Sequence, residues 1–182
     1  MVHPPIVALG YSEAAMLLRR PNAAGIGAVI SIHGKREFPV EAAIPHRLVL
    51  RFDDEDVPDP TDPVSVYRSY LRLKWAAANG LELRPPTVDD ARSIIEFAET
   101  IRHIDGMVLC QCAAGMSRST AAALLCLSVW TGEGREQYCV EELLRVRRGA
   151  VPHRDLVRLG DALLGRGGRL LEALRRVRQR DA

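Results

Sequence analysis

The sequence contains few cysteines, few aromatic residues and no long apolar run. Its four cysteines, at positions 110, 112, 126 and 139, are too few and too closely spaced for a disulfide scaffold. No stretch approaches the ~20 consecutive apolar residues that span a bilayer. The N-terminus also lacks a basic segment followed by a long apolar one. We therefore expect no membrane span, no secretory signal and the reducing environment of the cytoplasm.

The composition excludes several further classes of protein. Hydrophobic residues make up 47% of the chain and charged residues 26%, which is close to the averages of globular proteins. These proportions exclude a disordered chain, a collagen-like chain and a coiled coil. A length of 182 residues allows one domain with a proper core and is too short for two ordinary ones. We therefore expect a single domain over residues 1–182.

Positive charge is concentrated near the C-terminus. Residues 1–132 carry 13 basic and 15 acidic side chains, whereas residues 133–182 carry 12 arginines and 8 acids. A basic tail is typical of some nucleic-acid-binding proteins. Here, however, the arginines are mixed with acids, and aromatic residues that could stack on bases make up only 5% of the chain. We interpret the tail as a solvated helix face and expect no nucleic-acid partner.

Short apolar segments alternate with helical patterns along the chain. We predict strands over residues 6–9, 27–33, 46–52 and 107–111. We predict helices over about 13–20, 64–78, 87–103, 120–130, 136–148 and 155–164, and a final basic helix. Ser12 is the expected cap of the first helix, and Thr87 that of the third. Strands that alternate with helices predict an α/β fold whose mainly parallel sheet is flanked by helices.

One segment has the residue types of an anion-binding turn. Cys112 ends a predicted strand, five residues follow it, and Arg118 begins a buried helix. Backbone N–H groups of such a turn can converge into a nest for a tetrahedral oxyanion, and Gly115 allows the backbone angle of a tight turn. The predicted anion-binding residues are Ala113, Ala114, Gly115, Met116, Ser117 and Arg118.

The side chains at the two ends of this turn complement each other chemically. Arg118 can donate two parallel hydrogen bonds to anion oxygens, which lysine cannot do. The same donors favour the thiolate form of Cys112, which is the nucleophilic form of cysteine. Ser119 is placed to donate a hydrogen bond to that sulfur and so to ease its departure. We therefore predict that Cys112 is a nucleophile.

The other cysteines admit less specific interpretations. Cys110 and Cys112 are two residues apart, not three, and no second ligand pair follows, so a zinc site is not expected. Cys110 could form a protective disulfide with Cys112 after oxidation. Cys126 and Cys139 fall in predicted helices and are expected to belong to the core.

The segment resembles the signature of the cysteine-dependent protein tyrosine phosphatases, most of all the dual-specificity type. That signature is His-Cys, five residues, Arg, then Ser or Thr. The whole chain resembles a bacterial branch of predicted tyrosine phosphatases, and it fits best from Met107 to Leu127. One residue departs from the signature, because Gln111 stands where the family has histidine. That histidine assists the thiolate, so the change predicts a slower enzyme rather than a missing nucleophile.

The resemblance implies a dual-specificity phosphatase-like fold and a metal-independent phosphatase that needs no cofactor. Such an enzyme hydrolyses phosphomonoesters, on phosphotyrosine or dual-specificity protein substrates or on small molecules, through a phosphocysteine intermediate. The family uses one aspartate as general acid and then as general base. Residues 53–63 contain six acids and three prolines and must form a loop. Within it Asp54 fits the family pattern best, with Asp53 and Asp56 as rivals.

Some alternatives remain open from the sequence. Asp54 lies 58 residues before Cys112, which suggests an insertion at about 55–86 over the active-site face. Gln111 keeps open a catalytically weak module that only binds phosphorylated ligands, and an arsenate reductase or a sulfurtransferase is a further alternative. His153 follows Pro152 where similar phosphatases often have Asn, and it is a candidate for indirect support of the site. The isolated histidines are expected to be structural or exposed: His33, His46 and His103.

Overall fold

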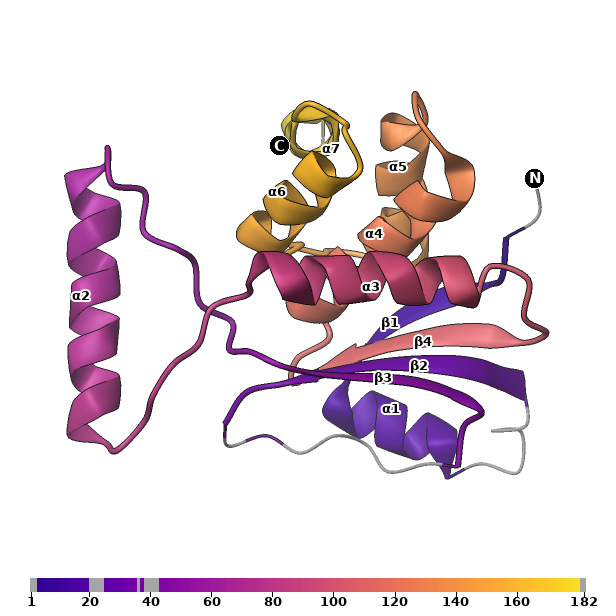
Figure 1. Ribbon diagram of the computed structural model, residues 1–182, viewed down its shortest axis with the longest axis horizontal. Helices are drawn as coiled ribbons and strands as arrows, with labels where there is room; N and C mark the ends of the chain where they lie inside the picture. The colour runs from indigo at the N-terminus through magenta and orange to yellow at the C-terminus, as the bar shows by residue number, and fades with distance from the viewer. Residues whose placement is uncertain (1–2, 20–24, 36, 38–42, 181–182) are drawn as a thin grey trace.

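The computed structural model describes residues 3–19, 25–35, 37 and 43–180. Within these residues, four strands form one parallel sheet in the order β1–β4–β2–β3 (Figure 1). Their bounds are Ile6–Gly10 for β1, Ile26–His33 for β2, His46–Arg51 for β3 and Met107–Cys112 for β4. Since β4 lies between β1 and β2, its carboxyl end opens at the middle of the sheet.

Helices cover both faces of this sheet (Figure 1). Helix α1 lies on one face, and α3 to α7 form a layer on the other. The helices are α1 (Tyr11–Leu18), α2 (Pro63–Ala78), α3 (Val88–Thr100), α4 (Arg118–Thr131), α5 (Glu136–Val146), α6 (Arg154–Leu163) and α7 (Arg169–Arg180). The predicted α/β fold with a parallel sheet flanked by helices is confirmed.

The main core lies between the sheet and the larger helical layer. Helix α4 crosses its centre, and every residue from Arg118 to Trp130 is buried, as expected for a helix that is apolar almost all round. The ring of Trp130 is buried between α4 and α3, where its Nε1 donates to the Ala98 carbonyl over 2.8 Å. Because α4 is packed on all sides, its N-terminal residues are held rigidly at the end of β4.

Two predicted helix starts had different outcomes. Thr87 caps α3 as predicted, since its side chain accepts from the Asp90 amide and Asp90 accepts from the Thr87 amide. That helix ends at Thr100, before His103. Ser12 was a wrong prediction, because α1 already begins at Tyr11 and Gly10 occupies the cap position.

At the start of α1, the Glu13 carboxylate accepts from the Gly10 amide over 2.8 Å and so replaces a capping side chain. The predicted C-terminal end of this helix, at about residue 20, lies outside the described residues.

Helix α2 stands apart from the helical layer, at the left of Figure 1. The chain leaves β3 through an acidic segment (residues 53–62), runs through α2 and returns through residues 80–86 to α3. The outgoing and returning chains pair where they pass, because Asp53 N donates to Arg84 O over 2.7 Å and Arg84 N donates to Asp53 Oδ2 over 2.8 Å. The guanidinium of Arg84 also bonds the Arg51 carbonyl and both oxygens of Asp90.

Candidate active site

Cys112 is the last residue of β4, and its side chain is 2% exposed. Two groups approach its sulfur from beyond the strand. The amide of Gly115 donates to Sγ over 3.3 Å, and the thiol donates to Ser119 Oγ over 3.2 Å. The sulfur therefore has an N–H donor on one side and a hydroxyl on the other.

The five residues between β4 and α4, which we call the Cys112 loop (residues 113–117), are tightly fixed. Gly115 has φ of +72°, and a Cβ placed there would lie 2.2 Å from Gly10 N. Only glycine fits this combination of backbone angle and close contact. On either side, Ala113 O accepts from Tyr11 N over 3.0 Å and Met116 O accepts from Val151 N over 2.9 Å. The loop is therefore clamped between the β1–α1 junction and the segment before α6.

Arg118 is the first residue of α4 and is 3% exposed. Its terminal nitrogens donate to both carboxylate oxygens of Glu37, over 2.8 and 3.0 Å, and Nη1 also donates to Phe52 O over 3.1 Å. Its Nε is buried and has no hydrogen-bond partner among the described residues. Buried donors are nearly always paired, so this N–H is available to a ligand.

Glu37 holds the guanidinium in a planar, two-bonded pair. Partial burial raises the pKa of Glu37, but the hydrogen bonds from Arg118 and from the Gly34 amide outweigh it, so the pKa lies below its ordinary value. The carboxyl therefore stays charged at neutral pH and keeps Arg118 oriented. Glu37 was not among the residues predicted from the sequence. Its one available signal was its position shortly after β2, at the same edge of the sheet as Cys112.

The three candidate acids after Phe52 occupy different surroundings. Asp54 accepts a hydrogen bond from the hydroxyl of Ser117 in the Cys112 loop, over 2.5 Å. Asp53 instead bonds the Arg84 amide in the returning chain. Asp56 is the most exposed of the three, with a side chain that is 75% exposed against 47% for Asp54. Of these carboxylates, Asp54 has a direct hydrogen bond to the Cys112 loop.

His153 is buried between the acidic segment and the Cys112 loop. Its Nε2 lies 3.1 Å from Glu55 O, and its Nδ1 accepts from the Leu156 amide at 3.5 Å and so caps α6. Since Nδ1 accepts, the ring proton is on Nε2, which donates to Glu55 O. The backbone amide of His153 donates to Ser117 O over 3.3 Å. One residue thereby fixes the acidic segment relative to the loop.

The side-chain amide of Gln111 is buried, and both its oxygen and its nitrogen are hydrogen-bonded within the protein. Its Oε1 accepts from Ser31 Oγ over 2.6 Å, and its Nε2 donates to the Cys112 carbonyl over 3.1 Å. Gln111 thus supports the backbone of Cys112 through a neutral donor. Ser31 was not among the residues predicted from the sequence, although a serine within the apolar run of β2 was a visible signal.

The remaining candidates lie outside these contacts. Cys110, Cys126 and Cys139 are free and fully buried, so the prediction that Cys126 and Cys139 belong to the core is confirmed. A hydrogen bond with Cys126 and burial together raise the pKa of Cys110, which keeps it a thiol. His33 is buried at the end of β2, whereas His46 and His103 are half-buried and exposed, respectively.

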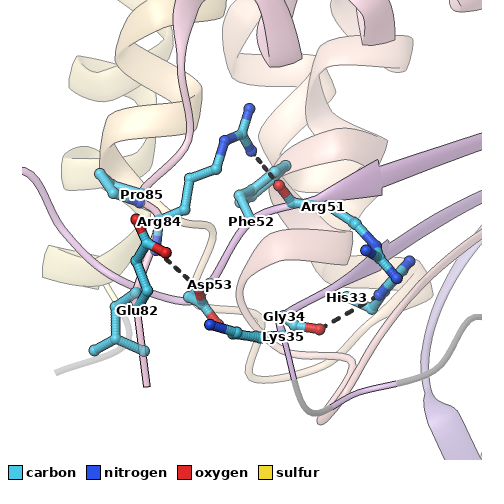
Figure 2. A pocket seen from close by; sticks show the side chains of 10 residues that line it. His33, Gly34, Lys35, Arg51, Phe52, Asp53, Glu82, Arg84 and Pro85 are labelled. Atoms are coloured by element: carbon cyan, nitrogen blue, oxygen red, sulfur yellow. Dashed lines mark hydrogen bonds between the residues drawn. The ribbon is translucent and has the colours of Figure 1, made fainter. Parts of the chain in front are cut away.

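A cavity of about 430 Å³ lies between the end of β2, the start of the acidic segment and the chain returning to α3 (Figure 2). It is lined by His33, Gly34, Lys35, Arg51, Phe52, Asp53, Glu82, Leu83, Arg84 and Pro85. Two of these touch the ion pair directly, because Phe52 O accepts from Arg118 and Gly34 N donates to Glu37. Figure 2 shows Arg84 reaching across one wall towards the main chain of Arg51.

No family model matches this sequence, and no curated protein resembles it detectably in sequence. Solved structures do resemble it in fold. The structure of Tk-PTP in the active form aligns over 91% of this chain and 94% of that chain, with a TM-score of 0.54 and 16% identity. PTPMT1, solved in complex with PI(5)P, aligns over 95% of this chain and 94% of that chain, with a TM-score of 0.51 and 14% identity. The chain therefore has the fold of these phosphatases.

Proposed function

We propose that this chain is a phosphatase of the protein tyrosine and dual-specificity superfamily, in its bacterial branch, and that it hydrolyses phosphomonoesters without a metal. The observation that carries this proposal is the pairing of Cys112 with Arg118 across one fixed loop. The nucleophile receives an N–H donor from Gly115, while Arg118 keeps a buried N–H unpaired. The fold that the chain shares with Tk-PTP and PTPMT1 supports the same assignment.

The Cys112 loop and Arg118 together would bind the phosphoryl group. Phosphoryl transfer has a loose transition state with charge spread over three equatorial oxygens, so positioned donors do most of the catalysis. Amides of residues 113–118 can supply such donors at the start of α4. Arg118 would add its Nε–H, and its Nη groups remain held by Glu37.

In the first chemical step, Cys112 Sγ attacks phosphorus as a thiolate. An S–P bond forms while the bond from phosphorus to the ester oxygen breaks, and that oxygen takes a proton from Asp54. The Asp54 carboxyl accepts a hydrogen bond from Ser117 of the Cys112 loop, which supports this role.

In the second step, a water molecule attacks phosphorus and the S–P bond breaks. Asp54, now ionised, accepts the proton of that water, and Cys112 leaves as a thiolate with inorganic phosphate as the product. Ser119 lies 3.2 Å from the sulfur and would stabilise the departing thiolate.

The rest of the substrate would lie over the rim of the site. The cavity between the end of β2 and the chain returning to α3 carries the exposed cations Lys35 and Arg51 and the anion Glu82. We propose a phosphorylated protein, on tyrosine or with dual specificity, as the substrate class, with small phosphomonoesters as the alternative.

Hydrolysis of p-nitrophenyl phosphate in the presence of a metal chelator tests this function. We expect turnover that vanadate inhibits, and we expect Cys112→Ser to abolish turnover while phosphate still binds, because the loop amides and Arg118 remain. Cys139→Ala is the matched control, since Cys139 lies in α5, away from the Cys112 loop.

Two other outcomes would replace the proposal. Phosphate binding with no turnover in the wild type would favour a module that only binds phosphorylated ligands, the role that Gln111 leaves open. Activity that survives Cys112→Ser would contradict the proposed nucleophile.

A further inference from the structure

Helix α2 has its apolar side turned outwards. Ser65 and Ser69 are half-buried and Ala76 is buried, whereas the large apolar residues of the helix are between 42% and 62% exposed. These exposed residues, which we call the outer face of α2, are Val64, Val66, Tyr67, Tyr70, Leu71, Leu73 and Trp75. The usual arrangement in a globular protein is the opposite one, with the apolar stripe against the core.

The polar side of α2 faces the acidic segment, as the contacts of the helix show. Ser65, Ser69, Arg72 and Ala76 fall at helical spacing and share one side of the helix. Along that side, Ser65 Oγ accepts from the Asp59 amide over 3.1 Å, and Arg72 pairs with Glu55 at 2.6 Å. Polar residues of α2 therefore attach the helix to the acidic segment. An apolar surface of this extent on the other side is typical of an interaction site.

The charge of α2 restricts what can cover the outer face. The helix carries Arg68, Arg72 and Lys74 and no acidic residue. Arg72 is paired with Glu55, but Arg68 and Lys74 form no ion pair within the described part of the chain. Lys74 lies 5.8 Å from the centre of the Tyr70 ring, among the exposed aromatics. The outer face therefore combines Trp, Tyr and Leu with unpaired cations.

We propose that α2 is an interfacial helix that docks this protein on an anionic membrane surface. Tyr and Trp side chains favour the depth of the lipid head groups, with their rings towards the acyl chains. Arg68 and Lys74 would meet the phosphates of anionic lipids, and basic residues near such a surface strengthen binding. At 16 residues the helix is ~24 Å long.

The helix would lie in the plane of the interface. Among the described residues, no helix has the length and apolar character needed to cross a bilayer. The acidic segment contacts the polar side of α2, where Glu55 pairs with Arg72 and the Asp59 amide donates to Ser65. A negatively charged membrane would repel this segment. That repulsion orients the outer face, and not the acidic side, towards the membrane.

A second copy of the chain is a poorer occupant of this surface. Two α2 helices packed through their outer faces would bring Arg68 and Lys74 of one copy near the same cations of the other. Each helix carries positive charge alone, so the pair would be repulsive where an anionic lipid surface would be attractive.

The two tryptophans of the chain give a direct measurement. Trp75 is 62% exposed on α2, and Trp130 is 2% exposed in the core. With vesicles of phosphatidylcholine and 30% phosphatidylglycerol, we expect a blue shift of the emission and quenching of Trp75 by lipids brominated on their chains. Trp130 cannot reach those lipids and serves as the internal reference. Vesicles of phosphatidylcholine alone should bind at least tenfold more weakly.

Variants of the outer face separate its apolar and electrostatic contributions in vesicle co-sedimentation. The double variant Tyr70→Ser, Trp75→Ser should reduce partitioning at least tenfold on both vesicle types. The double variant Arg68→Glu, Lys74→Glu should remove the preference for anionic lipid. Tyr138→Ser on α5 is the matched control, because Tyr138 is 45% exposed outside α2 and should change neither quantity.

This inference can fail independently of the proposed enzymatic activity, because the variants leave the Cys112 loop intact and hydrolysis of p-nitrophenyl phosphate should be unchanged. A monomer that does not bind anionic vesicles would overturn the membrane proposal. So would binding that the α2 variants do not weaken. A dimer detected by light scattering and dissolved by the Tyr70→Ser, Trp75→Ser variant would assign the outer face to a second copy instead.

Discussion

The orientation of Arg118 is fixed before any ligand binds. Burial of a guanidinium requires that its donors be paired, and here Glu37 and the Phe52 carbonyl pair the two terminal nitrogens. Of the three guanidinium nitrogens of Arg118, only Nε has no hydrogen-bond partner among the described residues. A phosphate that bonds Nε would complete the pairing without reorienting the side chain, which is the pre-organisation that electrostatic catalysis needs.

Replacement of Arg118 by lysine should therefore be severe although the charge is kept. A lysine has one nitrogen and cannot bond both Glu37 oxygens and a phosphate oxygen in the same plane. We expect kcat/KM for p-nitrophenyl phosphate to fall by about 10²- to 10³-fold, the usual effect of losing a positioned donor. Arg145→Lys on α5, in an exposed pair with Glu142, is the control and should leave the kinetics unchanged. Near-normal kinetics for Arg118→Lys would place the arginine outside the site.

The role of Asp54 can be separated from that of its neighbours by leaving-group dependence. A general acid helps only where charge develops on the departing oxygen, so Asp54→Asn should lower the rate by about 10²- to 10⁴-fold on phosphotyrosine. The loss should be much smaller for leaving groups that depart without a proton. Asp53→Asn and Asp56→Asn, measured on the same series, are the controls. A selective loss in either control would transfer the assignment to that residue.

At the scale of elements, the β4–loop–α4 unit was predictable because its geometry is encoded locally. Cys112, Gly115 and Arg118 lie within one short segment, and each residue type has a physical reason at its position. Glu37 was not predictable in this way, because its contact with Arg118 joins residues 81 positions apart. No pattern in the sequence around Glu37 indicates that it pairs with Arg118.

The orientation of α2 could not be read from the sequence either. The helical spacing of residues 64–78 predicts a helix, but it does not indicate which side of that helix contacts the rest of the chain. The side of α2 that faces the acidic segment is set by Glu55 and Asp59, which precede the helix and bond Arg72 and Ser65. The insertion at 55–86 over the active-site face remains a prediction.

The Cys112 loop should tolerate no side chain at Gly115. Gly115→Ala combines a positive φ with a Cβ 2.2 Å from Gly10 N, so either the loop or the start of α1 must move. Gly80→Ala is a matched control, because Gly80 has φ of +67° and no atom within 4 Å of a Cβ. Each should lose roughly 1 to 2 kcal/mol from the positive φ, and only Gly115→Ala should lose more stability and most of the activity. Urea denaturation and hydrolysis of p-nitrophenyl phosphate measure the two effects, and equal effects would contradict the close contact.

At the scale of the whole molecule, carboxylates join parts of the fold that are far apart in the chain. Glu13 on α1 pairs with Arg147 at the end of α5, Glu37 pairs with Arg118, and Glu136 pairs with Arg169. Hydrogen bonds from Arg147 and from the Gly10 amide lower the pKa of Glu13, and at Glu37 those from Arg118 and Gly34 outweigh the effect of burial. Burial also raises the pKa of Glu136, but hydrogen bonds from backbone amides and from Arg169 outweigh burial, so its pKa lies below the ordinary value.

These shifts predict loss of stability in acid. Each folded-state pKa lies below the ordinary glutamate value of 4.5, so near that pH the unfolded chain binds more protons than the folded one. The stabilisation that these three ionised carboxylates contribute is complete above pH 4.5, and it is lost progressively as the pH falls through their folded-state pKa values. Glu55 contributes with the opposite sign, because burial raises its pKa against the effect of Arg72.

Denaturant unfolding at a series of pH values from 7 to 3 measures the free energy of unfolding, with Trp130 emission as a probe of the core. We expect a plateau above pH 5 and a decline below pH 4.5. Glu13→Gln should lower the plateau and flatten the decline, because its carboxyl no longer titrates between the two states, whereas Glu55→Gln should not flatten it. A decline of equal steepness in Glu13→Gln and wild type would show that the pair between α1 and α5 contributes nothing to acid sensitivity.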